Sequence, residues 1–268
     1  MELVMQQRSA FRNGLKDKRF DKTAKFDANN LHLFKVAVLL GYGDAKRTFS
    51  KIGEFWNNKQ IQRDAFFETI AKKLQLLFTN NASDTWHEDL CENFCSELAQ
   101  LGYNNVTYGQ AQKVINMALK YLFCFDGAEK YKTVFDKCHM PLDSYTLSWY
   151  RKLPKPVDKN ARIYYDTKWS NLTKEKYIAI QDHIRDRLKN DSKIKIDDQE
   201  ILLPNQPLYA EFIIWPEEIL LMAGNSFMKA LNPDHKNIDS DSMCLLKHIL
   251  YQQLPKYCKL DVSITEKK

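Results

Sequence analysis

Lys113 and Asp143 are two residues whose types and sequence positions could do chemistry. Lys113 ends a Gly-Gln-Ala-Gln-Lys run and opens an apolar stretch, which places it in the first turn of a predicted helix. The positive dipole end of a helix disfavours an ammonium charge, so a lysine there is pushed toward the free amine that a nucleophile needs. Asp143 follows Pro141 in a turn before the next predicted helix, where unpaired backbone N–H groups favour an ionised carboxylate. The two residues form a candidate nucleophile and its carboxylate partner.

The surroundings of this pair resemble those in the helix–hairpin–helix DNA glycosylases. In that family a hairpin precedes the helix with the catalytic lysine, and a Pro-x-Asp element follows at the start of the next helix. Lys113 and the segment from Pro141 to Asp143 match these positions. The long gap between them, and the Gln-Lys before an apolar helix, are most similar to the 8-oxoguanine glycosylases, especially their archaeal and minor bacterial branches. Endonuclease III is less similar, because its iron–sulfur cluster needs four closely spaced cysteines and only Cys244 and Cys258 lie beyond residue 138.

This resemblance implies a DNA repair glycosylase and AP lyase that removes an oxidised purine, 8-oxoguanine, from duplex DNA. The damaged nucleotide would be flipped out of the helix, and Lys113 would attack C1′ of its sugar. The resulting link can rearrange to a Schiff base, after which β-elimination cuts the strand. Asp143 would stabilise the positive charge that develops on the sugar and assist proton transfers. The resemblance implies neither a cofactor nor a metal.

A base pocket needs a stacking aromatic ring and hydrogen-bonding groups. Gln110, Tyr145 and Trp149 are the substrate-binding candidates, because they are close in sequence to the catalytic pair. His139 could be a further base or phosphate contact, although a histidine beside a cysteine is more often structural.

The turn from Gly102 to Gly109 would present backbone N–H groups to a DNA phosphate, as glycine-bearing turns before helices do. It departs from the usual hairpin of the family, a tight apolar-Pro-Gly-apolar-Gly turn, because it is longer and lacks the proline. This departure favours an alternative function, a non-catalytic DNA-binding or interaction module, for example one that senses modified bases in phage defence. Under that alternative, Lys113 is an exposed helix lysine and Asp143 an ordinary helix cap.

The cysteines are the candidate metal ligands of this chain. Cys91 and Cys95 share a helix face and could form one half of a zinc site, with Cys138 and His139 as the other half. We favour reduced, buried thiols, because neither pair has the Cys-x-x-Cys spacing of structural zinc sites.

The composition indicates a folded, soluble protein. Of 268 residues, 44% are hydrophobic and 12% aromatic. The net charge of +6 is compatible with binding a polyanion but does not by itself indicate DNA binding. The basic run from Arg8 to Lys25 could contact DNA or simply be solvated surface. No apolar run is long enough to span a membrane and no signal peptide is recognisable. We therefore expect a cytoplasmic monomer whose partner is duplex DNA with a damaged base, not a membrane.

Apolar periodicity predicts a mainly α protein with one small β-hairpin in its C-terminal part. The chain divides into a basic N-terminal segment (1–28), a helix–hairpin–helix glycosylase-like core (29–150) and a C-terminal helical part packed on that core (151–268). Helices are predicted over 29–40, 49–56, 63–78, 83–101, 110–125, 144–150, 173–188, 208–215 and 242–254, and the hairpin over 193–203. Pro216 is expected to end the helix over 208–215.

Overall fold

A computed structural model describes residues 1–79, 83, 85–154, 167–190, 192–196 and 199–231. Over these residues the fold is mainly helical, with one two-stranded antiparallel sheet, as predicted. The predicted helix over 242–254 lies outside the described residues. Among the described helices, none is both long and apolar enough to cross a lipid bilayer.

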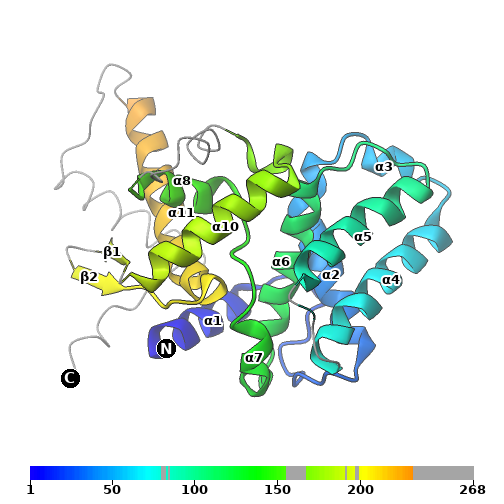
Figure 1. Cartoon of the computed structure of the whole chain (residues 1–268), viewed down its shortest axis with the longest axis horizontal. Coiled ribbons are helices and arrows are strands. Elements are labelled where there is room, and N and C mark those ends of the chain that lie inside the picture. Colours follow the sequence, from blue (N-terminus) through cyan, green and yellow to red (C-terminus); the bar gives the residue numbers. More distant parts are fainter. Residues whose placement is uncertain (80–82, 84, 155–166, 191, 197–198, 232–268) are drawn as a thin grey trace.

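The helices and strands follow one another along the chain as the elements α1 (Glu2–Gly14), α2 (Leu31–Ala45), η1 (Lys46–Thr48), α3 (Ile52–Phe55), α4 (Gln60–Thr79), α5 (Trp86–Gln100), α6 (Tyr108–Phe123), η2 (Ala128–Tyr131), α7 (Lys132–Phe135), α8 (Ser144–Lys152), η4 (Trp169–Asn171), α10 (Lys174–Lys189), β1 (Lys193–Ile196), β2 (Gln199–Leu202) and α11 (Pro207–Leu231). In Figure 1, helices α2 to α5 form one half of the molecule and α1, α8, α10 and α11 the other, with α6 between the halves.

Helix α6 is the central element of the fold. Every residue from Gly109 to Phe123 is buried, so the helix is covered on all sides. It packs along α2, and the two backbones meet at Gly41, where an added Cβ would lie 2.4 Å from the carbonyl oxygen of Val114. A glycine is required there because any side chain would collide with the α6 backbone. This close approach places the last turn of α2 beside the segment of α6 that carries Lys113.

The small sheet forms as predicted. Strand β1 pairs antiparallel with β2, with Lys193 opposite Leu202. Ile194, Ile196 and Ile201 are buried, whereas Lys193, Lys195, Glu200 and Leu202 are exposed, which is the alternation expected of a half-covered hairpin.

The N-terminal segment contains a helix that the basic run did not indicate. Helix α1 buries Val4 and Phe11 together with Arg8. The Arg8 guanidinium donates to the Phe123 carbonyl oxygen at 3.3 Å and pairs with Glu129 at 3.2 Å. Part of the basic run therefore holds α1 on the protein instead of facing solvent or DNA.

The prediction that Pro216 ends its helix was wrong. Helix α11 continues through Pro216 to Leu231. A proline inside a helix costs about 3 kcal/mol because its N–H is missing and its ring crowds the preceding turn. Buried residues on both sides, among them Phe212 and Leu220, keep the helix packed on α8 and α1, and we attribute its continuity to that packing.

Candidate active site

Lys113 and Asp143 meet in a buried ion pair. The Lys113 Nζ lies 2.8 Å from Asp143 Oδ2, and the side chains are only 6% and 11% exposed. Lys113 lies in the second turn of α6, not the first, because the helix begins at Tyr108. Thr107 and Gln110 form a capping box that starts the helix earlier than predicted. The charge that acts directly on the Lys113 ammonium is therefore that of Asp143 rather than the end of the helix dipole.

Asp143 caps α8, as predicted. Its Oδ1 accepts the backbone N–H groups of Tyr145 and Thr146, each at 2.9 Å, and its own N–H donates to Thr146 Oγ1. Burial acts to raise the pKa of Asp143, but the Lys113 charge and hydrogen bond, together with the Thr146 N–H, outweigh it and lower the pKa. The carboxylate is therefore held ionised and fixed in orientation.

A buried polar network holds the loop that precedes Asp143. The Gln112 side chain bonds to both backbone groups of Leu142, and Gln181 bonds to both backbone groups of Met140. Gln112 Oε1 also accepts from Asn116 Nδ2 at 2.9 Å. The loop is thus tied to α6 on one side and to α10 on the other.

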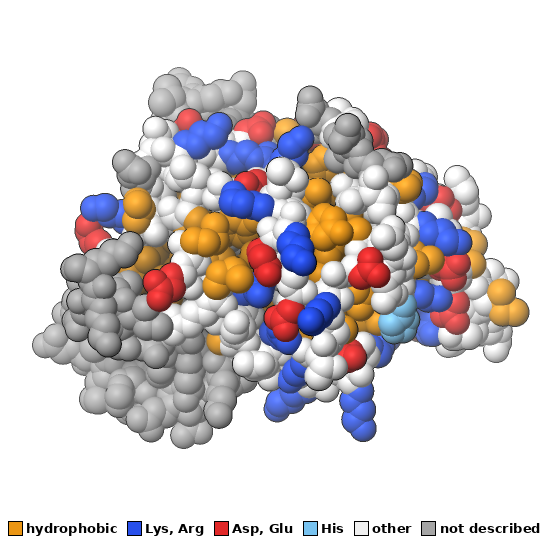
Figure 2. All heavy atoms as spheres, turned by 90° about the horizontal axis from the view of Figure 1, so that it is seen from below, with side chains coloured by type: hydrophobic (Ala, Val, Ile, Leu, Met, Phe, Trp, Pro, Cys, Tyr) orange, Lys and Arg blue, Asp and Glu red, His pale blue; other side chains and the backbone are white. Residues whose placement is uncertain are grey.

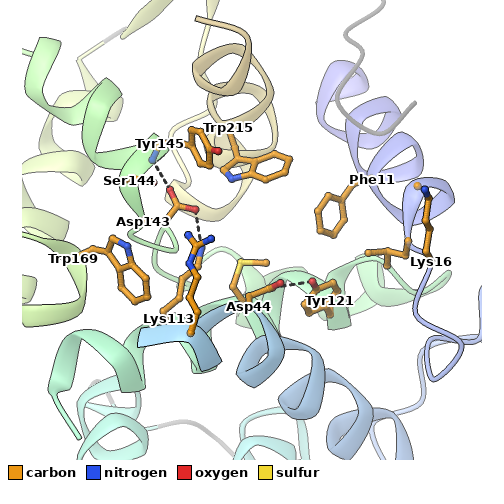
Figure 3. Close-up of a pocket in the computed structure, with 14 residues that line it drawn as sticks. Phe11, Lys16, Asp44, Lys113, Tyr121, Asp143, Ser144, Tyr145, Trp169 and Trp215 are labelled. Atoms are coloured by element: carbon orange, nitrogen blue, oxygen red, sulfur yellow. Dashed lines mark hydrogen bonds and ion pairs between the residues drawn. The ribbon is translucent and has the colours of Figure 1, made fainter. Parts of the chain in front are cut away.

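A pocket of about 410 Å³ opens beside the ion pair. Its walls come from segments far apart in the sequence, and Figure 3 shows the ion pair surrounded by aromatic rings. The lining combines these rings with charged groups: Phe11, Tyr121, Tyr145, Trp169 and Trp215, and Lys16, Asp44 and Arg47. Such a mixture of flat apolar surfaces and a few polar groups suits a planar polar ligand.

Asp44 is a second carboxylate in this pocket. It stands in the last turn of α2, and its Oδ2 accepts the Tyr121 hydroxyl at 2.9 Å. Its side chain is open to the solvent of the pocket, yet the surrounding protein removes enough water to raise its pKa. The Lys113 charge and the Tyr121 hydrogen bond act in the opposite direction.

A second buried ion pair lies behind the pocket. Lys120, on α6, donates to Glu211 of α11 at 2.9 Å, and its Nζ lies 4.3 Å from the Phe11 ring centroid and 4.9 Å from that of Trp215. Burial raises the pKa of Glu211, although Lys120 counteracts this effect. The pair links α6 to α11 and supports the wall that carries Trp215.

Of the predicted substrate-binding residues, Tyr145 lines the pocket. Trp149 is buried and is not among the lining residues. Gln110 is buried in the capping box, where its Oε1 accepts the Thr107 N–H and its Nε2 donates to the Thr48 carbonyl oxygen. Its polar atoms are therefore engaged within the protein.

His139 lies in the buried network and not in this pocket. It stacks on His87 with ring centroids 4.0 Å apart, and its Nδ1 is 2.7 Å from the Tyr177 hydroxyl. Burial lowers the pKa of His139 well below its ordinary value, and the charge of His87 acts in the same direction. These contacts match the structural alternative for this histidine.

The two predicted backbone-binding glycines differ in their surroundings. Gly102 has φ +95° and open space around its Cα. Gly109 donates its N–H to the Leu172 carbonyl oxygen at 3.0 Å, and a Cβ there would lie 2.1 Å from the Trp169 carbonyl oxygen. Gly109 thus allows the segment with Trp169 to lie directly on the start of α6, and its amide is engaged within the protein.

Phe11, Asp44, Trp169 and Trp215 line the pocket but were not predicted from the sequence. Asp44 carried a usable signal, since it is the one acidic residue of a mostly apolar helix and stands in its last turn. The three aromatic residues carried none, because rings are abundant in this chain and most of them pack in the core.

The cysteines lie apart from the candidate site. Cys91 contacts His87 at 3.8 Å, whereas Cys138 donates to the Val134 carbonyl oxygen. In the described part of the chain, no three histidine, cysteine or acidic side chains are grouped so as to hold a metal ion.

Charge is mixed on the face shown in Figure 2, where basic side chains alternate with acidic ones and with apolar patches. Comparison with known proteins found no matching family model, curated protein or solved structure.

Proposed function

We propose that this protein is a DNA glycosylase and AP lyase of helix–hairpin–helix type that removes an oxidised purine, 8-oxoguanine, from duplex DNA. The observation that carries the proposal is the buried Lys113–Asp143 pair, 2.8 Å apart, in the wall of an aromatic-lined pocket. In this proposal the protein acts as a monomer in the cytoplasm, and duplex DNA with a damaged base is its partner.

The pocket suits a flipped nucleotide. A volume of about 410 Å³ lies within the range of small-molecule sites, roughly 300 to 1,000 Å³. A base taken out of the DNA stack loses its neighbours, and aromatic rings such as Trp169 and Trp215 can replace them. The basic residues Lys16 and Arg47 lie on the same pocket lining and can approach the phosphates of the flipped nucleotide.

The ion pair provides a route to the nucleophile. As the nucleotide enters, Asp143 accepts a proton from the Lys113 ammonium along their hydrogen bond, and the free amine attacks C1′ of the sugar. The C1′–N9 bond breaks, its electron pair leaves with the base, and Asp143 gives the proton that it accepted from Lys113 to the departing base. Asp143 is then ionised again and stabilises the positive charge on the lysine-linked sugar. The lysine-linked sugar then opens to a Schiff base, and β-elimination can release the 3′ phosphate.

A second candidate is a DNA-binding module without catalysis. It is favoured by the engaged Gly109 amide and by the mixed charge of the face in Figure 2. In that case the Lys113–Asp143 pair serves only to hold α6 against α8.

Borohydride trapping separates the two candidates. The protein is incubated with duplexes that contain 8-oxoguanine or an abasic site, and sodium borohydride is added to reduce any imine to a stable amine. The glycosylase proposal expects a covalent adduct that Lys113→Gln abolishes and that Asp143→Asn reduces at least a hundredfold. Lys73→Gln is the matched control, because Lys73 is also an ion-paired helical lysine but lies outside the pocket. No adduct from folded wild-type protein on either duplex would support the binding module.

A further inference from the structure

Asp44 has no part in the nucleophilic step, yet it faces the same pocket. In Figure 3 it lies between Lys113 and Tyr121, on the side of the pocket that leads away from the ion pair toward Phe11. If the Lys113 amine attacks C1′ of the sugar, the base of the flipped nucleotide extends beyond Lys113 into this part of the pocket. Asp44 is then a polar group next to the base.

The position of Asp44 is set by its packing and its hydrogen bond. Gly41 allows α2 to lie directly on α6, and Tyr121 of α6 donates its hydroxyl proton to Asp44 Oδ2 at 2.9 Å. An ionised carboxylate has about four lone-pair sites and no donor. One bond from Tyr121 leaves acceptor capacity on a side chain that is open to the pocket.

We propose that Asp44, oriented by Tyr121, accepts hydrogen bonds from two adjacent N–H groups on the edge of the flipped base and so selects guanine-type bases. This inference rests on the proposed glycosylase function and adds the residue that reads the base. A guanine-type edge presents N1–H and the 2-amino group side by side. An adenine-type edge presents the N1 lone pair, which a carboxylate repels.

The preference follows from the cost of unpaired groups. A site built to bond an N–H group disfavours an analogue that lacks it, because an acceptor from which the bound base has displaced water is then left without a partner. Replacing Asp44 with asparagine replaces two acceptor oxygens with one acceptor oxygen and one donor NH2 group. That pattern cannot accept two N–H groups from the guanine-type edge, but it matches the adenine-type edge.

The test measures single-turnover base release from four duplexes. Three contain 8-oxoguanine, 8-oxohypoxanthine, which lacks the 2-amino group, or 8-oxoadenine, and the fourth contains an abasic site for borohydride trapping. Wild-type protein is expected to release 8-oxoguanine at least tenfold faster than 8-oxohypoxanthine. Asp44→Asn should bring that ratio below about threefold and shift the relative rates toward 8-oxoadenine. Tyr121→Phe, which leaves the carboxylate without its orienting hydroxyl, should reduce the ratio by a smaller factor.

The control is Asp182→Asn, the same chemical change at an exposed aspartate on α10 outside this pocket. It should keep the wild-type ratio. An unchanged ratio in Asp44→Asn, with wild-type protein still trapped on the abasic duplex, overturns the assignment of Asp44 and leaves the glycosylase proposal in place. Failure of wild-type protein to be trapped on the abasic duplex overturns the glycosylase proposal, and the assignment of Asp44 falls with it.

Discussion

Gln112 and Leu142 exchange two hydrogen bonds, from Gln112 Nε2 to the Leu142 carbonyl oxygen at 3.1 Å and from the Leu142 N–H to Gln112 Oε1 at 3.3 Å. The two partners are the immediate sequence neighbours of Lys113 and Asp143. The amide of Gln112 therefore fixes the backbone on one side of the ion pair relative to the backbone on the other. We therefore expect Gln112 to help position the Lys113 Nζ and the Asp143 Oδ2, which lie 2.8 Å apart.

Gln112→Leu should lower both stability and trapping. The change leaves the buried N–H and carbonyl groups of Leu142 unpaired, at a cost of about 1–3 kcal/mol each, and frees the residue next to Asp143. Gln181→Leu is the matched control, because it removes the same kind of contact from Met140, farther from the carboxylate. Urea unfolding should show a loss of stability in both variants, larger for Gln112→Leu because Gln112 also accepts from Asn116, whereas borohydride trapping should fall at least tenfold more in Gln112→Leu. Equal trapping rates would contradict the positioning role of Gln112.

Acidification should unfold the protein through its buried histidines. Burial lowers the pKa of His87 to about 3 and that of His139 well below its ordinary value. In the unfolded chain each titrates near 6.5, so the stability from keeping them neutral is complete above pH 6.5 and is lost as pH falls toward 3. The free energy of unfolding should drop by about 1.4 kcal/mol per pH unit for each histidine.

Urea unfolding at pH 6 and pH 5 measures this slope. His139→Gln should reduce the slope by up to about 1.4 kcal/mol per pH unit, since one buried imidazole is gone. His32→Gln, at an exposed histidine, should keep the wild-type slope. A His139→Gln slope equal to that of the wild type would show that His139 can be protonated inside the folded protein.

Trp215→Leu should impair base release more than trapping at an abasic site, because the proposed role of this pocket-lining ring is to stack on the flipped base, which an abasic site lacks. Stacking of a base on an aromatic ring contributes about 1–3 kcal/mol, so release of 8-oxoguanine should slow by roughly five- to 150-fold. Trp149→Phe is the comparison, since Trp149 was the sequence-based candidate and does not line the pocket. Equal slowing by both variants would contradict this assignment.

Gly41→Ala should destabilise the fold, since the new methyl group would lie 2.4 Å from a carbonyl oxygen of α6. Overpacking of this kind costs about 1–3 kcal/mol. Gly43→Ala is the control in the same helix, where no atom lies within 4 Å of the added Cβ, and it should stabilise the protein by about 0.5–1 kcal/mol through helix propensity. Thermal unfolding of the two variants should therefore shift in opposite directions.

The parts of the fold that sequence predicts are those coded by local patterns. The start of α8 follows from Asp143 as an N-cap, and the β-hairpin follows from the alternation around Ile194 and Ile196. Helix α1 was missed because Arg8 is buried by partners on a distant segment, at Phe123 and Glu129. Hydrophobic periodicity contains no information about such pairings.

The site was predictable only in part for the same reason. Lys113 and Asp143 each stand at a recognisable helix position, so their pairing could be proposed in advance. Asp44 and Trp215 come to the pocket through the packing of α2 and α11 on α6, which no local pattern encodes. The position of Lys113 in the second turn depended on which residue starts the helix, and helix ends are the least certain feature of any sequence pattern.

Residues from α1, α2, α6, α8, η4 and α11 line the pocket. Because these elements are spread along the chain, the pocket can form only after α11 has been synthesised. Trp215 is the last of the lining residues to leave the ribosome, long after Lys113 and Asp143. A nascent chain that ends before α11 carries the lysine and the aspartate without the wall that α11 supplies. The pocket is therefore completed late in synthesis. It is complete only when both α1 and α11 have packed against the rest of the described fold.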